Sequence, residues 1–82
     1  MRQMLGAEIR GEIAAQGLGI TEVAARAGME RTSLWRYLKG ERAMPLDALV
    51  ALADALQLDA SELVQRAEQR ARRNPQIGGE AD

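Results

Sequence analysis

The sequence predicts a single all-α domain, a compact bundle of five helices. Apolar residues recur at intervals of three and four positions, which is the period of a helix, and no segment alternates apolar and polar residues as a strand does. The chain has 82 residues, which is enough for one domain. It has no cysteine and no phenylalanine, so packing of aliphatic side chains must supply most of its stability.

The first three predicted helices each place apolar residues on one face and end at a glycine. In the first helix the inward positions are four residues apart: Leu5, Ile9 and Ile13. In the second they follow an i, i+3, i+4, i+7 pattern: Ile20, Val23, Ala24 and Ala27. In the third they are Leu34, Tyr37 and Leu38. The glycines that follow suit a left-handed stop: Gly17, Gly28 and Gly40.

The fourth predicted helix begins near Pro45, because proline suits a first helical turn. Its inward positions are Leu49, Leu52, Ala53 and Leu56. Asp59 and Glu62 have the spacing of an acidic capping box and open the fifth helix. The apolar positions of that helix are Leu63, Val64, Ala67 and Ala71. Asn74-Pro75 ends it, so we expect a folded domain over residues 1–73 and a disordered tail over 74–82.

Charge is unevenly distributed along the chain, although the formal net charge is only −1. Residues 19–42 hold five basic and three acidic side chains, whereas residues 43–61 hold three aspartates and no basic residue. The pattern predicts a polarised surface rather than a uniformly acidic protein.

The composition disfavours catalysis and membrane association. Histidine and cysteine are absent, and no nucleophile–base pair or set of metal ligands is apparent, so we expect no enzyme activity, cofactor, metal or small-molecule ligand. There is no apolar run of about 18 residues, and the N-terminus lacks the features of a secretory signal. We therefore expect a cytoplasmic protein with no membrane partner.

The segment Ile20–Lys39 has the residues that two steeply crossing helices need. Ala24 lies where the second helix of the pair would cross the first, and a larger side chain there would push them apart. Gly28 falls four residues later, where a tight turn requires a positive φ. Leu34, six residues after this glycine, faces back toward Ala24. The pattern predicts a helix-turn-helix.

With these residues in place, the chain resembles the helix-turn-helix family of the phage lambda repressor and Cro, the XRE-like proteins. The resemblance covers about residues 5–66, nearly the whole predicted domain. The short motifs that carry it are Ile9-Arg10, Val23-Ala24, Gly28-Met29 and Lys39-Gly40. The last two helices add the apolar frame Leu49, Ala53, Leu56, Leu58 and Leu63.

The resemblance implies a lambda-repressor-like DNA-binding domain with a recognition helix at about residues 31–38, lying in the major groove. The positions that read bases in the family fall on Arg31, Thr32, Ser33 and Arg36. Lys39 and Arg42 suit phosphate contacts, although either cation could simply be solvated. Helical spacing predicts that Trp35 is largely exposed. It would then cover a sugar or a thymine methyl, or pack over the neighbouring helix without any ligand.

The chain departs from the family at the start of both helices of the motif. Gly19 and Ile20 stand where the family has a Ser or Thr cap and a glutamine that binds a phosphate. Glu30 stands where a small capping residue is expected, and its charge repels the DNA backbone. We therefore expect modest affinity for DNA.

These features predict a sequence-specific transcriptional regulator of double-stranded DNA, a repressor similar to those of phages and prophages. A homodimer on a palindromic operator would double the contacts of one module. Val64, Ala67 and Ala71 form a strip on the C-terminal helix that would either make this dimer or pack within the monomer. The alternative function is an antitoxin or another protein-interaction module that uses the same fold.

Overall fold

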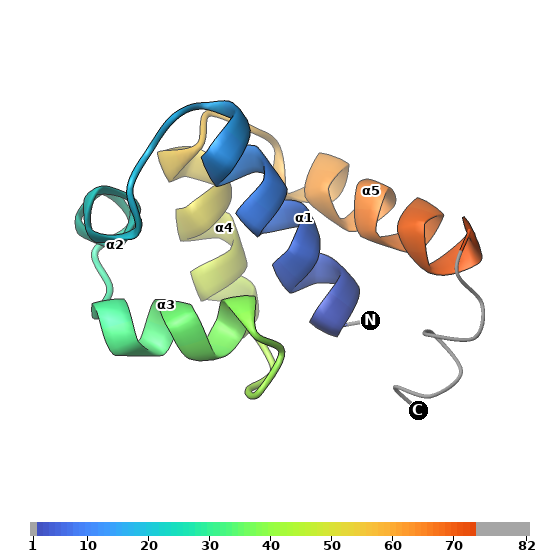
Figure 1. Ribbon diagram of the computed structural model, residues 1–82, viewed down its shortest axis with the longest axis horizontal. Coiled ribbons are helices and arrows are strands. Elements are labelled where there is room, and N and C mark those ends of the chain that lie inside the picture. Colours follow the sequence, from blue (N-terminus) through green and yellow to red (C-terminus); the bar gives the residue numbers. More distant parts are fainter. Residues whose placement is uncertain (1, 74–82) are drawn as a thin grey trace.

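The computed structural model describes residues 2–73, and these fold into five α-helices with no strand among them (Figure 1). The helices are α1 (Arg2–Ala15), α2 (Ile20–Ala27), α3 (Arg31–Leu38), α4 (Leu46–Ala55) and α5 (Ala60–Arg73). The predicted all-α, five-helix class is therefore confirmed. The predicted disordered tail, 74–82, lies outside the described residues.

The core is built from the faces that the apolar spacing predicts. Every helix contributes at least one side chain that is fully excluded from solvent, and the largest of these are Ile9, Val23, Leu34, Leu38, Leu52, Leu56 and Leu63. Complete burial of each aliphatic side chain contributes about 1.5–3 kcal/mol. All of them belong to one continuous cluster, so the five helices share a single core.

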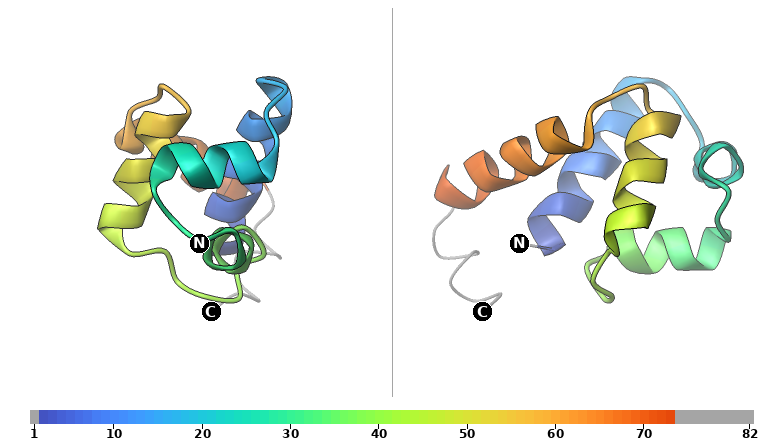
Figure 2. Two further views of the ribbon diagram at one scale, coloured as in Figure 1. Left: turned by 90° about the vertical axis from the view of Figure 1, so that its left-hand side faces the viewer. Right: turned by 180° about the vertical axis from the view of Figure 1, so that it is seen from behind.

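Two segments pack on opposite sides of α1 (Figures 1 and 2). The C-terminal end of α3 meets one side of α1, and α5 packs against the other. Helix α2 packs on both α3 and α4, and its axis runs nearly across that of α3. The position of α3 therefore depends on α1, α2 and the core beneath it.

A glycine inside α1 sets how closely α3 approaches, a feature that the apolar pattern did not predict. Gly6 is buried, and a Cβ atom added to it would collide with the backbone carbonyl of Leu38. Gly11, in the same helix, faces open space instead. Glycine inside a helix lowers stability by about 1 kcal/mol relative to alanine. At Gly6 the absence of a side chain allows the backbones of α1 and α3 to come into direct contact.

The four connections between helices repeat one hydrogen-bond pattern. At the end of α2, the Gly28 N–H donates to the Ala25 carbonyl and the Met29 N–H donates to the Ala24 carbonyl, at 3.2 and 3.0 Å. This cap requires a left-handed residue, and Gly28 has φ +69° as predicted. The same pair of bonds closes the other helices, but at the end of α4 the left-handed residue is Gln57, with φ +60°.

Ion pairs join α1 to α5 along a line that we call the α1–α5 seam, formed by Glu8, Glu12, Arg66 and Arg70. The Glu12 carboxylate accepts from the Arg66 guanidinium at 2.8 Å, and the Glu8 carboxylate accepts from Arg70 at 2.9 Å. Glu8 and Glu12 are four residues apart on α1, and Arg66 and Arg70 are four residues apart on α5. The two ion pairs therefore lie one helical turn apart along the seam. Arg66 also donates to Glu62 at 2.6 Å.

The structure decides between two roles left open for α5 and contradicts a third expectation. Ala67 is completely buried and Val64 packs against the core, so these residues of the apolar strip pack within the monomer, one of the two expected roles. The predicted capping box, in contrast, is not formed. The Glu62 carboxylate binds Arg66, and within residues 3–73 the Asp59 carboxylate accepts no hydrogen bond. Arg66, one helical turn further along α5, thus binds the carboxylate that would have formed the cap.

Candidate nucleic-acid interface

The recognition helix α3 is held to the protein by one narrow face. Leu34 and Leu38 are fully buried in the core, one helical turn apart. Ala24 of α2 is buried in the same cluster, which agrees with its predicted place at the crossing of the two helices. The left view of Figure 2 shows α2 running across the molecule and α3 beneath it, seen end-on. The remaining faces of α3 are available to solvent or to flanking helices.

Most of the predicted site residues are exposed, and they lie on or just after α3. Arg31, Thr32, Arg36, Lys39 and Arg42 are all exposed. Because Leu34 and Leu38 face inward, Arg36 points away from the core, and Thr32 and Lys39 lie beside it on the outer surface. Of these residues, the structure brings Arg31, Thr32 and Lys39 together around one hollow beside α3.

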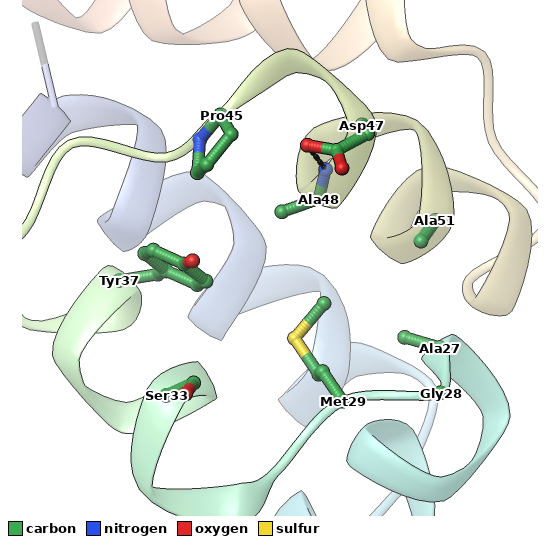
Figure 3. A pocket seen from close by; sticks show the side chains of 9 residues that line it. All are labelled: Ala27, Gly28, Met29, Ser33, Tyr37, Pro45, Asp47, Ala48 and Ala51. Atoms are coloured by element: carbon green, nitrogen blue, oxygen red, sulfur yellow. Dashed lines mark hydrogen bonds between the residues drawn. The ribbon is translucent and has the colours of Figure 1, made fainter.

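Ser33 departs from this group because it faces α4. It lines a cavity of about 270 Å³ between α3 and α4, together with Met29, Tyr37 and Pro45. Figure 3 shows the Met29 side chain pointing into this space and the Tyr37 ring lying beside Pro45. Tyr37, predicted as an inward position of this helix, is partly buried. Ser33 is thus on the flank of α3, next to the outer surface.

The prediction that Trp35 is largely exposed is wrong. Its side chain is partly buried and packs against the core. With Arg31, Thr32 and Lys39 it lines an open hollow of about 710 Å³ on the flank of α3 that lies opposite Ser33. The Lys39 ammonium nitrogen lies 5.8 Å from the centre of the indole ring, within the range of a cation–π contact.

The cations of this surface make no ion pair with the described part of the chain. Arg31, Arg36, Lys39 and Arg42 have no carboxylate within 4.0 Å among residues 3–73. In contrast, Arg26 of α2 binds Glu22 at 2.9 Å, and the arginines of the α1–α5 seam bind glutamates. The positive charge on and after α3 is therefore not neutralised by neighbouring carboxylates.

The starts of α2 and α3 lack side-chain caps, as their residue types predict. Gly19 precedes α2 in an extended conformation with no side chain to cap the helix, and Ile20 packs against the core. Glu30 precedes α3, and its carboxylate caps no backbone N–H. The first turn of each helix consequently leaves backbone N–H groups that no cap satisfies, a feature that favours an anion.

Residues 4–73 match the family model described as a helix-turn-helix domain. The chain belongs to the helix-turn-helix family. The predicted resemblance is confirmed, and with it the predicted class, a DNA-binding transcription regulator. The family and fold are those of DNA-binding regulators.

Solved structures share the fold of this helix-turn-helix protein. The clp gene regulator ClgR from Corynebacterium glutamicum is similar with a TM-score of 0.87 at 20% identity, over 98% of this chain and 85% of that chain. A second ClgR crystal structure gives 0.79 at 22% identity, over 84% and 90%. The restriction-modification controller protein C.AhdI from Aeromonas hydrophila gives 0.72 at 28% identity, over 74% and 92%.

No curated protein matches the chain. Within residues 2–73, no helix is both long and apolar enough to cross a membrane.

Proposed function

We propose that this helix-turn-helix protein is a sequence-specific repressor that binds double-stranded DNA with α3 in the major groove. The observation that carries the proposal is the division of α3 into two faces. Leu34 and Leu38 anchor one face in the core, while Arg31 and Arg36 lie exposed without carboxylate partners. A rigid helix that offers unneutralised arginines to solvent is suited to a polyanion whose grooves carry hydrogen-bond acceptors.

The predicted residues divide between base edges and phosphates. Arg31, Thr32 and Arg36 lie on the exposed surface of α3 and are proposed to contact bases. An arginine that donates two hydrogen bonds to guanine contributes about 1–3 kcal/mol of discrimination. Lys39 and Arg42 follow the end of the helix and are proposed to contact phosphates. Ser33, on the flank that faces α4, is proposed to reach DNA only at the edge of the contact.

A homodimer on a palindromic operator is part of the proposal, with half-sites about 34 Å apart. Because Ala67 is buried, the contact between protomers needs another surface than the predicted strip. Leu46 and Val50 lie one turn apart on α4 and are 73% and 43% exposed. We propose that the partner protomer covers these two large apolar side chains. Sedimentation of the wild-type protein and of Leu46→Glu at micromolar concentration tests this surface. If both proteins sediment as monomers, with and without DNA, the proposed contact is contradicted.

Selection of bound duplexes from a random library tests the main proposal. We expect a consensus with two-fold symmetry and tighter binding to the selected duplex than to a scrambled one of the same composition. Equal affinity for the two duplexes would contradict sequence-specific binding. The same proposal includes a cytoplasmic location and a binding role rather than an enzymatic one, which the match to a helix-turn-helix domain supports.

An antitoxin or another protein-interaction module is the second candidate. The exposure of Leu46 and Val50 favours it, because apolar side chains on a surface helix suit a protein partner. The library selection separates the two functions. A protein-interaction module that does not read DNA yields no consensus, and a toxin gene beside the gene for this protein supports it.

A further inference from the structure

We propose that Trp35 reads the C5 methyl group of a thymine, so that the protein distinguishes thymine from uracil at one position of each half-site. The inference rests on the proposed function, because it requires α3 to lie in the major groove. It concerns the hollow beside α3 that is lined by Arg31, Thr32, Trp35 and Lys39, and in particular Trp35, the one lining residue to which the DNA-binding proposal gives no role.

The indole ring is held in place before any ligand arrives. One part of it packs against the hydrophobic core, and Lys39 lies 5.8 Å from the ring centre. Packing against the core restricts the rotamers of the side chain, so ordering it on binding costs little. The ring is therefore a fixed part of the wall of the hollow rather than a mobile surface residue.

The hollow combines an apolar wall with a positive rim. Trp35 is the aromatic side chain among the four lining residues, and Arg31 and Lys39 supply two cations without a carboxylate partner among residues 3–73. None of the four lining residues is acidic. Such a lining accepts an apolar group carried by a polyanion, which favours DNA over an apolar protein segment.

Thymine is the base that offers such a group in the major groove, because its C5 methyl projects there beside polar edges. Trp35 has one N–H donor and no charge, so it is better suited to cover a methyl than to bind a phosphate. Arg31 precedes Trp35 by one helical turn and can reach an adjacent base pair. The geometry thus points to a thymine beside a base that Arg31 contacts.

The test replaces each thymine of the library-selected duplex by deoxyuridine, one position at a time. This change keeps the base pairing and removes only the methyl group. Loss of one buried methyl weakens binding about four-fold, and we expect this at one thymine of each half-site. A wild-type protein that binds every substituted duplex equally well, or a selected site without thymine, overturns the inference.

Two variants show which side chain reads the methyl. In Trp35→Ala the ratio of thymine to uracil affinity at that position should fall to about one. In Asp54→Asn, a control at an exposed residue of α4 outside the hollow, the ratio should persist, because the variant leaves the α3 surface unchanged. Persistence of the ratio in Trp35→Ala assigns the methyl to another residue and overturns the inference. A protein that selects no duplex at all instead refutes the proposed function.

A measurement on the unmodified protein avoids dependence on the folding of Trp35→Ala. Trp35 is the single tryptophan of the chain, so intrinsic fluorescence reports on this site alone. The emission of the wild-type protein should differ between the thymine duplex and the duplex with uracil at the sensitive position. Identical emission from the two saturated complexes contradicts a contact between the indole and the methyl.

Discussion

Arginine serves opposite purposes at two places in this molecule. In the α1–α5 seam, Arg66 and Arg70 bind Glu12 and Glu8 at 2.8 and 2.9 Å. On the outer side of α3, Arg31 and Arg36 are exposed and lack a carboxylate partner among residues 3–73. The difference indicates that charge in the seam fastens a helix to the domain, whereas charge on α3 is kept available for a ligand.

Helix α1 connects the two places, so changes in it or beside it can separate their functions. Its Gly6 side contacts the backbone of α3, and its glutamates contact α5. The comparison predicts that some substitutions affect stability alone and others affect DNA binding alone.

The largest effect is expected from Gly6→Ala. The new methyl collides with the Leu38 carbonyl, which is backbone and cannot move aside as a side chain would. We expect the free energy of unfolding to fall by about 3 kcal/mol, with loss of DNA binding as α3 shifts. Urea denaturation measures the change. Gly11→Ala is the matched control, because open space surrounds Gly11, and it should gain up to about 1 kcal/mol. Similar results for the two variants would contradict the role of Gly6.

Arg31→Ala should affect the α3 surface alone. Because this arginine is proposed to contact a base, we expect affinity for the selected duplex to fall about 5- to 150-fold, with little change for a scrambled duplex. The free energy of unfolding should stay within about 0.5 kcal/mol of wild type. Fluorescence anisotropy and urea denaturation check both statements. Arg66→Ala is the control from the seam, and it should lower stability while it leaves binding unchanged. The reverse outcome would remove the distinction between the two places.

Lys39→Ala should show a phosphate contact by its dependence on salt. A plot of the logarithm of the binding constant against the logarithm of salt concentration should become less steep by about 0.9, one phosphate contact. The loss should be similar for selected and scrambled duplexes, because phosphates carry no sequence. An unchanged slope shows that Lys39 does not bind a phosphate.

The smallest effect is expected in the seam at acid pH. Hydrogen bonds from Gln16 and Arg66 hold the pKa of Glu12 below its ordinary value of 4.5. The unfolded chain therefore binds this proton more readily, so the stabilisation is complete above about pH 4.5 and is lost as pH falls through the lowered pKa. Glu12→Gln should cost less than about 1 kcal/mol at pH 7 and should flatten the decline below pH 4.5.

Thermal unfolding of wild type and Glu12→Gln between pH 3 and pH 7 measures this difference. Asp54→Asn, which changes an exposed carboxyl outside the seam, is the control. Parallel pH curves for wild type and Glu12→Gln would show that the pair does not contribute.

The parts of the fold that follow from local spacing were predictable. The inward faces of the helices, the glycine corners and the exposure of Arg31, Thr32 and Arg36 all depend on residues a few positions apart. The seam was not predictable in this way, because Glu8 and Arg70 are 62 residues apart in sequence. Gly6 could have been noticed as a glycine inside an apolar helix, since such a residue often marks close packing.

Two side chains, one misplaced and one left open, show where helical spacing is insufficient. Trp35 lies on the flank of α3, where partial burial depends on how far the core extends beside the helix. Ala67 belongs to an apolar strip that spacing alone could assign either to a second protomer or to the monomer, and in the structure it is buried. In both cases the period identifies a side of the helix but not the neighbour that covers it. The DNA-contact roles themselves remain predictions.

The four helix ends close with the same pair of hydrogen bonds, yet Gln57 takes the left-handed position that glycine takes at the other three. A residue other than glycine in this left-handed conformation lowers stability by about 1–2 kcal/mol. Replacement by glycine removes this strain, but the greater conformational freedom of glycine in the unfolded chain offsets part of the gain. Gln57→Gly is thus a route to a more heat-resistant protein, with a melting temperature higher by about 2–6 °C. The position lies at the corner between α4 and α5, so thermal tolerance can be adjusted there without altering α3.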